Sequence, residues 1–309
     1  MSKLAFLFPG QGSQKPGMLL DIAQQHTQIQ STFEQASDAL SDDLWAMLRE
    51  GDADVMSLTA NTQPLILTAG VALWRIWQDN QGAQPELMAG HSLGEYTALA
   101  CSGVLSFEDA VRAVRFRGQA MQRAVPAGTG AMAAVIGLDD DAVVDVCANA
   151  SEGEVIEAVN FNAPGQVVIA GSASAVERAL PLLKEAGAKR ALPLPVSAPF
   201  HCALMRPAAD ELTDFMADVA FSAPSCPIVQ NVSVVAETDP ALIKTQVLKQ
   251  TYSPVRWTQT IQYLVSGGFD RSIECGPGAV LAGLAKRIDK SMSTQGLGDL
   301  ASLEQGLSA

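Results

Sequence analysis

The stretch Gly90-His91-Ser92-Leu93-Gly94 lies between a short apolar segment, 85–89, and a segment suited to a helix, 95–101. Strand, sharp turn and helix together form the context in which a Gly-x-Ser-x-Gly pattern presents its serine as a nucleophile. The flanking glycines lack the β-carbons that would collide in so tight a turn. The amide of Leu93, at the helix N-terminus, can then donate to a developing oxyanion. The alternative interpretation is a Gly/Ser turn that only joins a strand to a helix.

Size and composition favour one large folded domain, or one domain that carries an insertion. The chain has 309 residues, of which 48% are hydrophobic and 17% are charged, and this balance argues against disorder. No apolar run approaches ~18 residues, so we predict no membrane span. Residues 1–10 hold too short an apolar core for a signal peptide, and we interpret them as a first strand.

Cysteine usage and net charge limit the possible partners. The five cysteines are scattered without a Cys-x-x-Cys pair, and there are only three histidines. We therefore predict no metal site and a reducing, cytoplasmic location. The net charge of −13 disfavours nucleic acid as a partner. An acidic partner could dock only through a local basic patch.

The expected elements alternate as in an α/β protein. Before and after the serine turn we expect a strand at 4–8, helices within 19–50, a helix at 65–78 with its cap and first turn at 61–64, and a helix at 106–123. Residues 127–196 follow the order β-α-β-β-α-β of a ferredoxin-like unit, which ends in a strand at 190–196. We expect the remaining chain to form helices at 203–216, 240–250, 257–264 and 279–287 and strands at 228–232 and 271–275. The sequence thus predicts a main domain, 1–126 and 197–309, with a small domain, 127–196, inserted into it.

The helix at 106–123 carries one arginine on its apolar side. At ~100° per residue, Arg117 falls on a stripe with Ala110, Val114 and Met121, whereas the other arginines of this helix fall on the opposite, solvated side. An inward guanidinium needs a partner, because an unpaired buried charge is costly. That partner is either a carboxylate of the protein or a carboxylate on a ligand, which the planar fork can bind with two hydrogen bonds.

A serine nucleophile needs a base, and histidine is the usual base near neutral pH. His26 lies in a polar helical segment, and the side chain of His91 should diverge from that of its neighbour Ser92 at a sharp turn. By elimination His201 is the expected base. The alternative is a loop histidine whose hydrogen bonds are structural. An acidic third member is not apparent, since the nearest acids, Asp210 and Glu211, belong to the next helix.

Six blocks of the sequence resemble the malonyl-CoA:acyl-carrier-protein transacylase family of fatty-acid synthesis. They are 8–14 (FPGQGSQ), 90–96 (GHSLGEY), Arg117, 162–165 (NAPG), 197–201 (SAPFH) and 274–278 (ECGPG). The blocks occur in the family's order and cover essentially the whole chain. The resemblance implies an α/β-hydrolase-like core with a ferredoxin-like insertion.

The resemblance also implies a set of catalytic roles. Ser92 would carry the malonyl group, and His201 would act first as base and then as acid. The amides of Gln11 and Leu93 would form the oxyanion hole. A main-chain carbonyl, here that of Gln250, would orient His201 in place of an acid.

The implied substrate contacts centre on Arg117, which would hold the free malonyl carboxylate. Gln63, His91 and Asn162 would line the same substrate site. The implied partners are malonyl-CoA and acyl carrier protein, with no bound cofactor and no metal, and we expect a monomer. The densest basic clusters outside the arginine helix, Lys189-Arg190 and Lys286-Arg287, are the expected docking residues for the carrier protein, the alternative being an ordinary solvated surface.

Three rival functions share these residues. A serine thioesterase or esterase would use the same serine, histidine and oxyanion donors. A non-catalytic module that binds carrier protein would not need an intact Ser92 and His201. A related acyltransferase could prefer methylmalonyl or another acyl unit.

Overall fold

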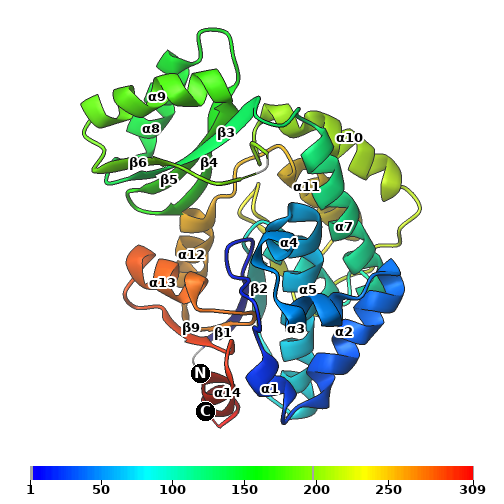
Figure 1. The fold of residues 1–309 in the computed structure, drawn as a ribbon. Helices are drawn as coiled ribbons and strands as arrows, with labels where there is room; N and C mark the ends of the chain where they lie inside the picture. Colours follow the sequence, from blue (N-terminus) through cyan, green and yellow to red (C-terminus); the bar gives the residue numbers. More distant parts are fainter. Residues whose placement is uncertain (1–2, 197, 309) are drawn as a thin grey trace.

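The structure is a computed structural model that describes residues 3–196 and 198–308 of the chain. The boundary predicted at 197, and Ser197 of the 197–201 block, lie outside the described residues. Two separate β-sheets, each packed against helices, make up the fold (Figure 1). The protein is therefore a mixed α/β protein, as the element order predicts.

The larger sheet is parallel except at one edge. Its strands, in spatial order, are β10 (Ser293–Gly296), β9 (Phe269–Glu274), β1 (Lys3–Phe8), β2 (Leu87–Gly90), β7 (Ile228–Val229) and β8 (Ala236–Glu237). Only the β7–β8 pair is antiparallel among the described pairs of this sheet. The strand before the serine turn thus lies beside the central strand β1.

Strand β1 forms the middle of the core because both of its faces are covered. Residues 5–8 are completely buried, as the continuous apolar run of a central parallel strand predicts. Phe8 pairs with Gly90, and Leu7 pairs with Glu274. Since the strands are parallel, the loops that follow β1, β2 and β9 lie together at the carboxyl ends of these strands.

Helices enclose this sheet on both sides (Figure 1). The first half of the chain supplies α1 (Leu20–Ala23), α2 (Thr27–Leu40), α3 (Leu44–Glu50), α4 (Ala53–Ser57), α5 (Thr59–Asp79), α6 (Leu93–Cys101) and α7 (Phe107–Arg123). The second half supplies the 3-10 turn η1 (Ala203–Met205), α10 (Arg206–Phe215), α11 (Pro240–Gln250), α12 (Trp257–Ser266), α13 (Val280–Ile288) and α14 (Leu300–Leu307).

The smaller sheet comes from the middle of the chain. Its elements are β3 (Gly130–Ile136), α8 (Asp140–Ala150), β4 (Ile156–Ala163), β5 (Gln166–Ser172), α9 (Ala173–Glu185) and β6 (Arg190–Pro193). The strands are antiparallel in the order β4-β5-β3-β6, and α8 and α9 pack together on one face. On β3, Ala133 and Val135 face these helices, whereas Met132 packs in a different apolar cluster on the opposite side.

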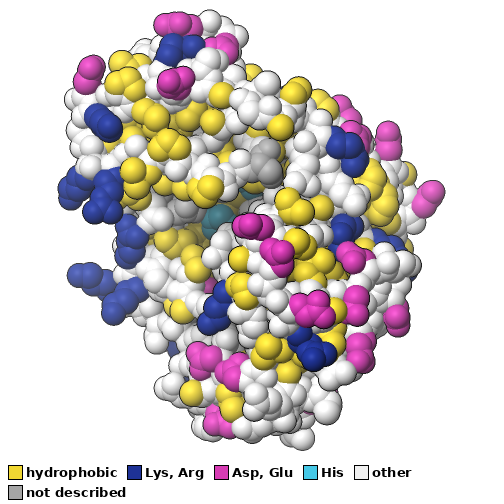
Figure 2. Space-filling model, in the orientation of Figure 1, with side chains coloured by type: hydrophobic (Ala, Val, Ile, Leu, Met, Phe, Trp, Pro, Cys, Tyr) yellow, Lys and Arg dark blue, Asp and Glu magenta, His cyan; other side chains and the backbone are white. Residues whose placement is uncertain are grey.

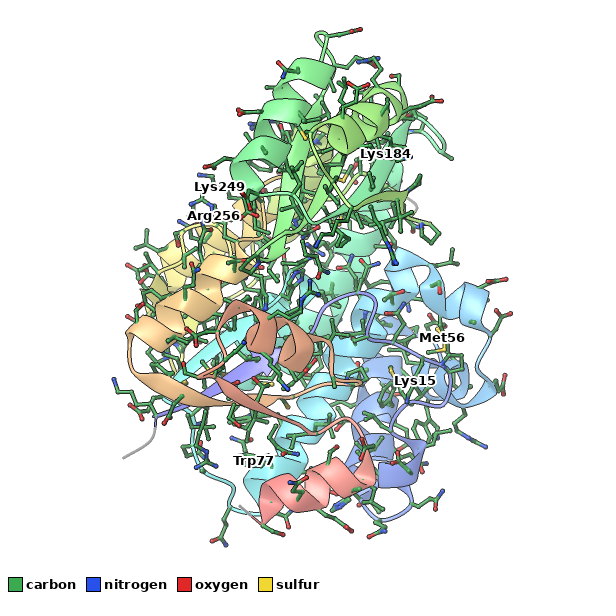
Figure 3. All side chains as sticks on the ribbon, turned by 90° about the vertical axis from the view of Figure 1, so that its left-hand side faces the viewer. Lys15, Met56, Trp77, Lys184, Lys249 and Arg256 are labelled. Carbon is green, nitrogen blue, oxygen red and sulfur yellow. The ribbon has the colours of Figure 1, made fainter. Side chains whose placement is uncertain are left out.

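Backbone hydrogen bonds join the smaller sheet to the rest of the molecule. The amide of Phe161 on β4 donates to the carbonyl of Val255 at 3.0 Å, and the amide of Val255 donates to the carbonyl of Val159 at 2.8 Å. Arg256 follows at the start of α12, beside the smaller sheet (Figure 3). This junction fixes β4 next to the carboxyl ends of the parallel strands, where the loops after β1, β2 and β9 lie.

The start of one expected helix and the ends of two expected strands are wrong. The helix expected at 65–78, with its cap and first turn at 61–64, is α5, which begins earlier, at Thr59, with Leu58 at its N-cap, so Pro64 lies beyond the first turn. Side-chain hydrogen bonds from Asn61 to the carbonyl of Val55 and from Thr62 to that of Met56 hold the first turn. Burial of the helix outweighs the hydrogen bond that Pro64 cannot donate.

The strand expected at 190–196 is the shorter β6, and the strand expected at 228–232 is the two-residue β7. β6 lies at an edge of its sheet, where short strands are common because a long exposed edge invites pairing with other chains. The elements α4, β8, β10 and α14 were not expected from the sequence. The other predicted helices and strands are present with ends shifted by a few residues.

Two further features bear on the sequence predictions. No helix within 3–196 and 198–308 combines the length and apolar character needed to span a membrane. All five cysteines are free thiols and are buried.

Candidate active site

The Gly-x-Ser-x-Gly stretch forms the predicted turn between β2 and α6. Ser92 has φ 52° and ψ −108°, a conformation that residues other than glycine rarely adopt. A β-carbon on Gly94 would lie 1.9 Å from the carbonyl oxygen of Phe8, so only glycine fits there. The turn therefore presses against the central strand and holds Ser92 at the carboxyl edge of the sheet.

Ser92, His201 and Gln250 form a hydrogen-bonded row. The hydroxyl of Ser92 lies 2.7 Å from Nε2 of His201, and Nδ1 of His201 lies 2.9 Å from the main-chain carbonyl of Gln250, the last residue of α11. A carbonyl oxygen only accepts, so Nδ1 carries the proton and donates it. Nε2 is then free to accept from the serine hydroxyl.

Burial keeps the imidazole of His201 neutral. The side chain is 4% exposed, and burial together with the nearby positive charge of Arg117 lowers the pKa of His201 to about 3. The acids considered from sequence lie elsewhere: Asp210 and Glu211 are on α10, where Glu211 pairs with Arg123. The group bonded to Nδ1 is thus the backbone carbonyl that the family resemblance implied, although no residue type in the sequence reveals it.

Arg117 is completely enclosed on the inner face of α7, as the helical stripe predicts. Its guanidinium donates to the side-chain oxygens of Gln63 at 2.8 Å and Gln250 at 2.9 Å, and it lies 3.4 Å from the hydroxyl of Ser92. The ring of Tyr96 lies below it, with the guanidinium carbon 5.4 Å from the ring centroid. Within the described chain no carboxylate touches this guanidinium, so the first of the two partners considered from sequence is wrong as a direct contact.

The other arginines of α7 do lie on its outer side, but one is not an ordinary solvated residue. The side chain of Arg115 is only 17% exposed and bonds Asp42 at 2.6 Å and Asn61 at 2.9 Å. Packing of α7 against the N-terminal helices covers this arginine, which a helical wheel alone cannot predict.

The two expected oxyanion donors follow β1 and β2, which pair directly in the larger sheet. Leu93 is the first residue of α6, so its amide has no carbonyl one turn earlier to bond within the helix. Gln11 lies in the loop after β1 and lines the cavity, and its side chain donates to Thr59 at 3.2 Å. A β-carbon on Gly10 would approach the carbonyl oxygen of His91 to 2.5 Å, so this loop packs directly on the serine turn.

His91 turns away from Ser92, as predicted, and links the serine turn to the smaller sheet. Its Nε2 lies 2.7 Å from the side-chain oxygen of Asn162 on β4, and its ring lies 5.5 Å from that of Trp257. Burial lowers the pKa of His91, so this histidine is also neutral at pH 7. His91 and Asn162 thus form one wall of the site.

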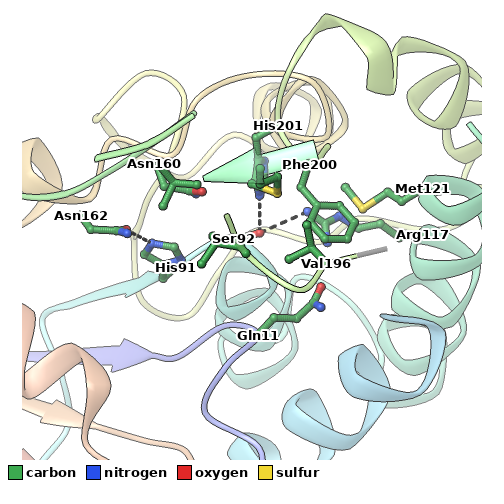
Figure 4. A pocket seen from close by; sticks show the side chains of 13 residues that line it. Gln11, His91, Ser92, Arg117, Met121, Asn160, Asn162, Val196, Phe200 and His201 are labelled. Carbon is green, nitrogen blue, oxygen red and sulfur yellow. Dashed lines mark hydrogen bonds between the residues drawn. The ribbon is translucent and has the colours of Figure 1, made fainter. Parts of the chain in front are cut away.

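These residues surround a cavity of about 210 Å³ between the two sheets (Figure 4). A hollow on the surface leads into it, and a histidine is visible at the bottom (Figure 2). The apolar part of the lining was not predicted from sequence, because it comes from scattered single residues of several elements. It consists of Met121, Met132, Val168, Leu194, Val196 and Phe200.

Below Ser92 lies a group of buried polar side chains that the sequence analysis also missed. Asn231 accepts from the amide of Ser92 at 2.8 Å and donates to the carbonyl of Gly90 at 2.7 Å. The side-chain amide of Gln250 donates to the carbonyl of Ser92 at 2.9 Å and to the carboxyl of Glu95 at 2.7 Å. The one available signal was Glu95 itself, an acid that directly follows the second glycine of the motif and opens an otherwise apolar helix.

The expected docking residues lie outside this cavity. Lys189 and Arg190 are exposed at the start of β6, and Lys286 and Arg287 lie in the last turn of α13. Arg287 reaches across to Gln166 on β5, so the two clusters come from neighbouring parts of the surface. Dark blue side chains accordingly gather along the left side in Figure 2, beside the hollow.

No group of three or more histidine, cysteine, aspartate or glutamate side chains is placed to hold a metal ion in the part of the chain that the structure describes. The groups that the structure does place at this site are a serine, a neutral histidine, the backbone amides at the start of α6 and one buried cation.

Comparison with known proteins assigns the chain to a family. The acyl transferase domain family matches residues 5–300, and the chain belongs to this family. A relative in Salmonella typhimurium, malonyl CoA-acyl carrier protein transacylase, is 53% identical over 307 residues, which are 99% of each chain.

Solved structures agree with this assignment. The crystal structure of an acyl carrier protein S-malonyltransferase from Vibrio cholerae is 55% identical, with a TM-score of 0.97 over 98% of this chain and 99% of that one. A malonyl-transacylase solved in complex with its type II PKS acyl-carrier protein is 49% identical, with a TM-score of 0.98 over 99% of both chains.

Proposed function

We propose that this protein transfers the malonyl group from malonyl-CoA to the phosphopantetheine thiol of acyl carrier protein in fatty-acid biosynthesis, through a malonyl-Ser92 intermediate. The names of its relatives support this activity. The observation that carries the proposal is Arg117, whose buried guanidinium lies 3.4 Å from the nucleophile and has neutral direct partners. Such a cation suits an acyl group that carries its own carboxylate.

In the first half-reaction the hydroxyl of Ser92 attacks the thioester carbonyl while Nε2 of His201 takes its proton. The carbonyl of Gln250 accepts from Nδ1 and so favours the imidazolium that forms. The amides of Leu93 and Gln11 stabilise the oxyanion. Collapse of the tetrahedral intermediate breaks the carbon–sulfur bond, and His201 returns the proton to the sulfur of coenzyme A.

In the second half-reaction the phosphopantetheine thiol enters the same cavity. His201 takes the thiol proton, the sulfur attacks the ester of Ser92, and the serine oxygen leaves with a proton from His201. The two halves share one covalent intermediate, which predicts ping-pong kinetics. Water must be kept from the ester, and the apolar lining of the cavity favours its exclusion.

The remaining residues position the substrate. In this proposal Arg117 pairs with the malonyl carboxylate, and Gln63 holds the guanidinium in place. His91 and Asn162 fix the wall between the serine turn and β4. The coenzyme A thioester is a substrate, and we propose that the reaction requires no bound cofactor and takes place in the cytoplasm.

We also propose a division of the chain into an α/β-hydrolase-like core, 1–126 and 197–309, and a ferredoxin-like insertion, 127–196. The parallel sheet with a serine turn after β2 supports the first part. The element order of β3 to β6 and the strand order β4-β5-β3-β6 support the second.

The intact mass of the protein after exposure to acyl-CoA, without a thiol acceptor, tests this function. We expect malonyl-CoA to give a stable adduct in the native protein, none in Ser92→Ala, and a very slow one in His201→Ala. Ser102→Ala, a buried serine at the end of the same helix, is the matched control and should acylate normally. Continuous release of coenzyme A without an adduct would instead identify a thioesterase.

Carrier docking through Lys189, Arg190, Lys286 and Arg287 has its own test. Arg190→Glu with Lys286→Glu should weaken transfer to carrier protein, more at low salt, while acylation by malonyl-CoA stays near the native rate. Lys184→Glu is the control, since Lys184 is exposed on α9, which packs on the same small sheet, and lies outside both clusters. Equal losses in both half-reactions would contradict a docking role.

A further inference from the structure

Glu95 is a completely buried acid directly beneath the nucleophile. It is the third residue of α6, and one carboxyl oxygen accepts from the side-chain amide of Gln250 at 2.7 Å and from the backbone amide of Asn231 at 3.2 Å. The second oxygen, Oε1, is buried and has no hydrogen-bond partner in the described part of the chain. The transfer mechanism given above does not use this group.

One side chain connects Glu95 with Arg117. The oxygen of the Gln250 side chain accepts from Arg117 at 2.9 Å, while its nitrogen donates to Glu95 at 2.7 Å. The amide dipole therefore lies between the cation and the carboxyl group with its oxygen toward the cation. Attraction between two charges that face each other through a buried amide is little screened by water.

The other titratable groups around this pair are uncharged near pH 7. Burial raises the pKa of Tyr96, the next residue on α6, to about 12. Burial and the charge of Arg117 hold the pKa of His201 low, and burial holds that of His91 low. Among the described groups that shift the pKa of Glu95, Arg117 is thus the one cation.

The charge of the buried site then depends on what occupies it. With Glu95 ionised, the empty site holds one positive and one negative charge. A malonyl carboxylate on Arg117 would add a second negative charge, and an uncompensated charge is expensive in a buried site. Uptake of one proton by Glu95 restores neutrality, whereas an acetyl group brings no charge and requires no change.

We propose that Glu95 is a positioning residue for substrates that carry a carboxylate: it balances Arg117 while the site is empty and takes up a proton when the acyl carboxylate pairs with the guanidinium. This inference rests on the proposed malonyl transfer. Burial raises the pKa of Glu95 to about 7, even though Gln250, Asn231 and Arg117 favour the ionised form. Either state is therefore accessible at the pH where the enzyme works.

The acylation step is otherwise neutral in protons. The serine proton passes to His201 and from there to the thiol of coenzyme A, so bond formation and cleavage neither release nor take up a proton. Any net uptake that accompanies malonylation consequently reports a group outside the reacting atoms. With a pKa of about 7 in the empty site, Glu95 should take up about half a proton per active site at pH 7.

The experiment mixes the native protein with malonyl-CoA in weakly buffered solution that contains a pH indicator, and the adduct is quantified by mass in the same sample. We expect uptake of about half a proton per adduct with malonyl-CoA and none with acetyl-CoA. Uptake that is absent with malonyl-CoA, or equal for both thioesters, overturns the inference.

Glu95→Gln is the matching variant. The glutamine oxygen can still accept from Gln250 and Asn231, while its nitrogen takes the place of Oε1. We expect malonylation without proton uptake. Glu274→Gln is the control, because Glu274 is an equally buried carboxyl that caps α13 and lies outside the residues around Ser92. Native uptake in Glu95→Gln overturns the inference.

The pH dependence provides a second readout. For the native protein, kcat/KM for malonyl-CoA relative to acetyl-CoA should fall by up to about tenfold per pH unit above pH 7, since ionised Glu95 opposes the substrate carboxylate. In Glu95→Gln this ratio should be flat. If no malonyl adduct forms in the native protein, the proposed function and this inference both fail; an adduct without proton uptake removes only the inference.

Discussion

Two arginines on α7, two residues apart, carry the same charge in opposite surroundings. Arg115 lies on the outer side and bonds a carboxylate, Asp42, at 2.6 Å. Arg117 lies on the inner side, 1% exposed, and its direct hydrogen-bond partners are the oxygens of two glutamines and a serine. The charge of Arg115 is already neutralised at contact distance, whereas the charge of Arg117 remains available to a ligand.

Burial alone does not show that an arginine binds a ligand. A buried arginine that contributes only to stability is expected to contact an acid directly, because removing its charge from water otherwise costs several kcal/mol. At Arg117 two glutamine side-chain amides and the ring of Tyr96 stabilise the positive charge, but less strongly than a carboxylate in direct contact would. We interpret this as a site prepared for a carboxylate that arrives with the substrate.

The largest expected effect is that of Arg117→Ala. Removing one partner of a desolvated guanidinium–carboxylate pair costs ~2–5 kcal/mol, or roughly 30- to 4,000-fold in rate at about 1.4 kcal/mol per decade. Malonyl transfer should fall by a factor in this range, and acetyl transfer should be kept or increase, because acetyl no longer leaves an unpaired arginine. The measurement is kcat/KM for both thioesters.

Arg115→Ala is the matched control for this variant and should leave both rates unchanged. A melting curve for each protein separates lost selectivity from lost folding. If Arg117→Ala depresses malonyl and acetyl transfer alike, Arg117 is a structural residue and its contrast with Arg115 has no functional meaning.

Arg117→Lys should have an intermediate effect. Lysine keeps the positive charge but lacks the planar fork, so the substrate carboxylate loses one of two charged hydrogen bonds. At about 1.5–3 kcal/mol per such bond, malonyl transfer should fall roughly 10- to 150-fold. The same kcat/KM assay decides, and a loss as large as that of the alanine variant would show that charge without the fork contributes nothing.

The pH dependence of serine labelling should also depend on Arg117. Because the pKa of His201 is about 3, labelling of Ser92 by a fluorophosphonate should stay level from pH 8 down to about pH 5. Arg117→Gln removes the second-largest cause of this low pKa, so the loss of labelling at acidic pH should begin about one pH unit higher. Burial, the larger cause, remains. Arg115→Gln should not shift this loss, and an identical loss in all three proteins would show that the charge of Arg117 does not reach His201.

The smallest expected effect is that of Arg115→Ala on stability. Its partly exposed pair with Asp42 should contribute about 1 kcal/mol or less to the free energy of unfolding. Urea unfolding of the native protein and the variant measures this difference. A change in the choice between malonyl and acetyl, without a change in stability, would contradict the assignment of the two arginines to different tasks.

Sequence reasoning was most successful where one element decides the outcome by itself. The period of an α-helix places Arg117 inward without knowledge of what it meets. The glycines of 90–94 require a tight turn, which the structure contains between β2 and α6. The same reasoning was less successful for Arg115, because helices from a different part of the chain cover it.

The sequence by itself determined the mixed α/β architecture, the serine turn, the inward face of α7 and the family resemblance, because each can be recognised from short stretches of residues and their order along the chain. The tertiary structure decided which atoms of these groups meet and what else surrounds them. Ser92 and His201 are 109 residues apart, and Gln250 lies 158 residues from Ser92. A backbone carbonyl leaves no mark of residue type, and the burial of Glu95 arises only when α6, α11 and the loop at Asn231 pack together. Folding brings these groups, which are far apart in the chain, into contact, and no local sequence pattern specifies such a contact.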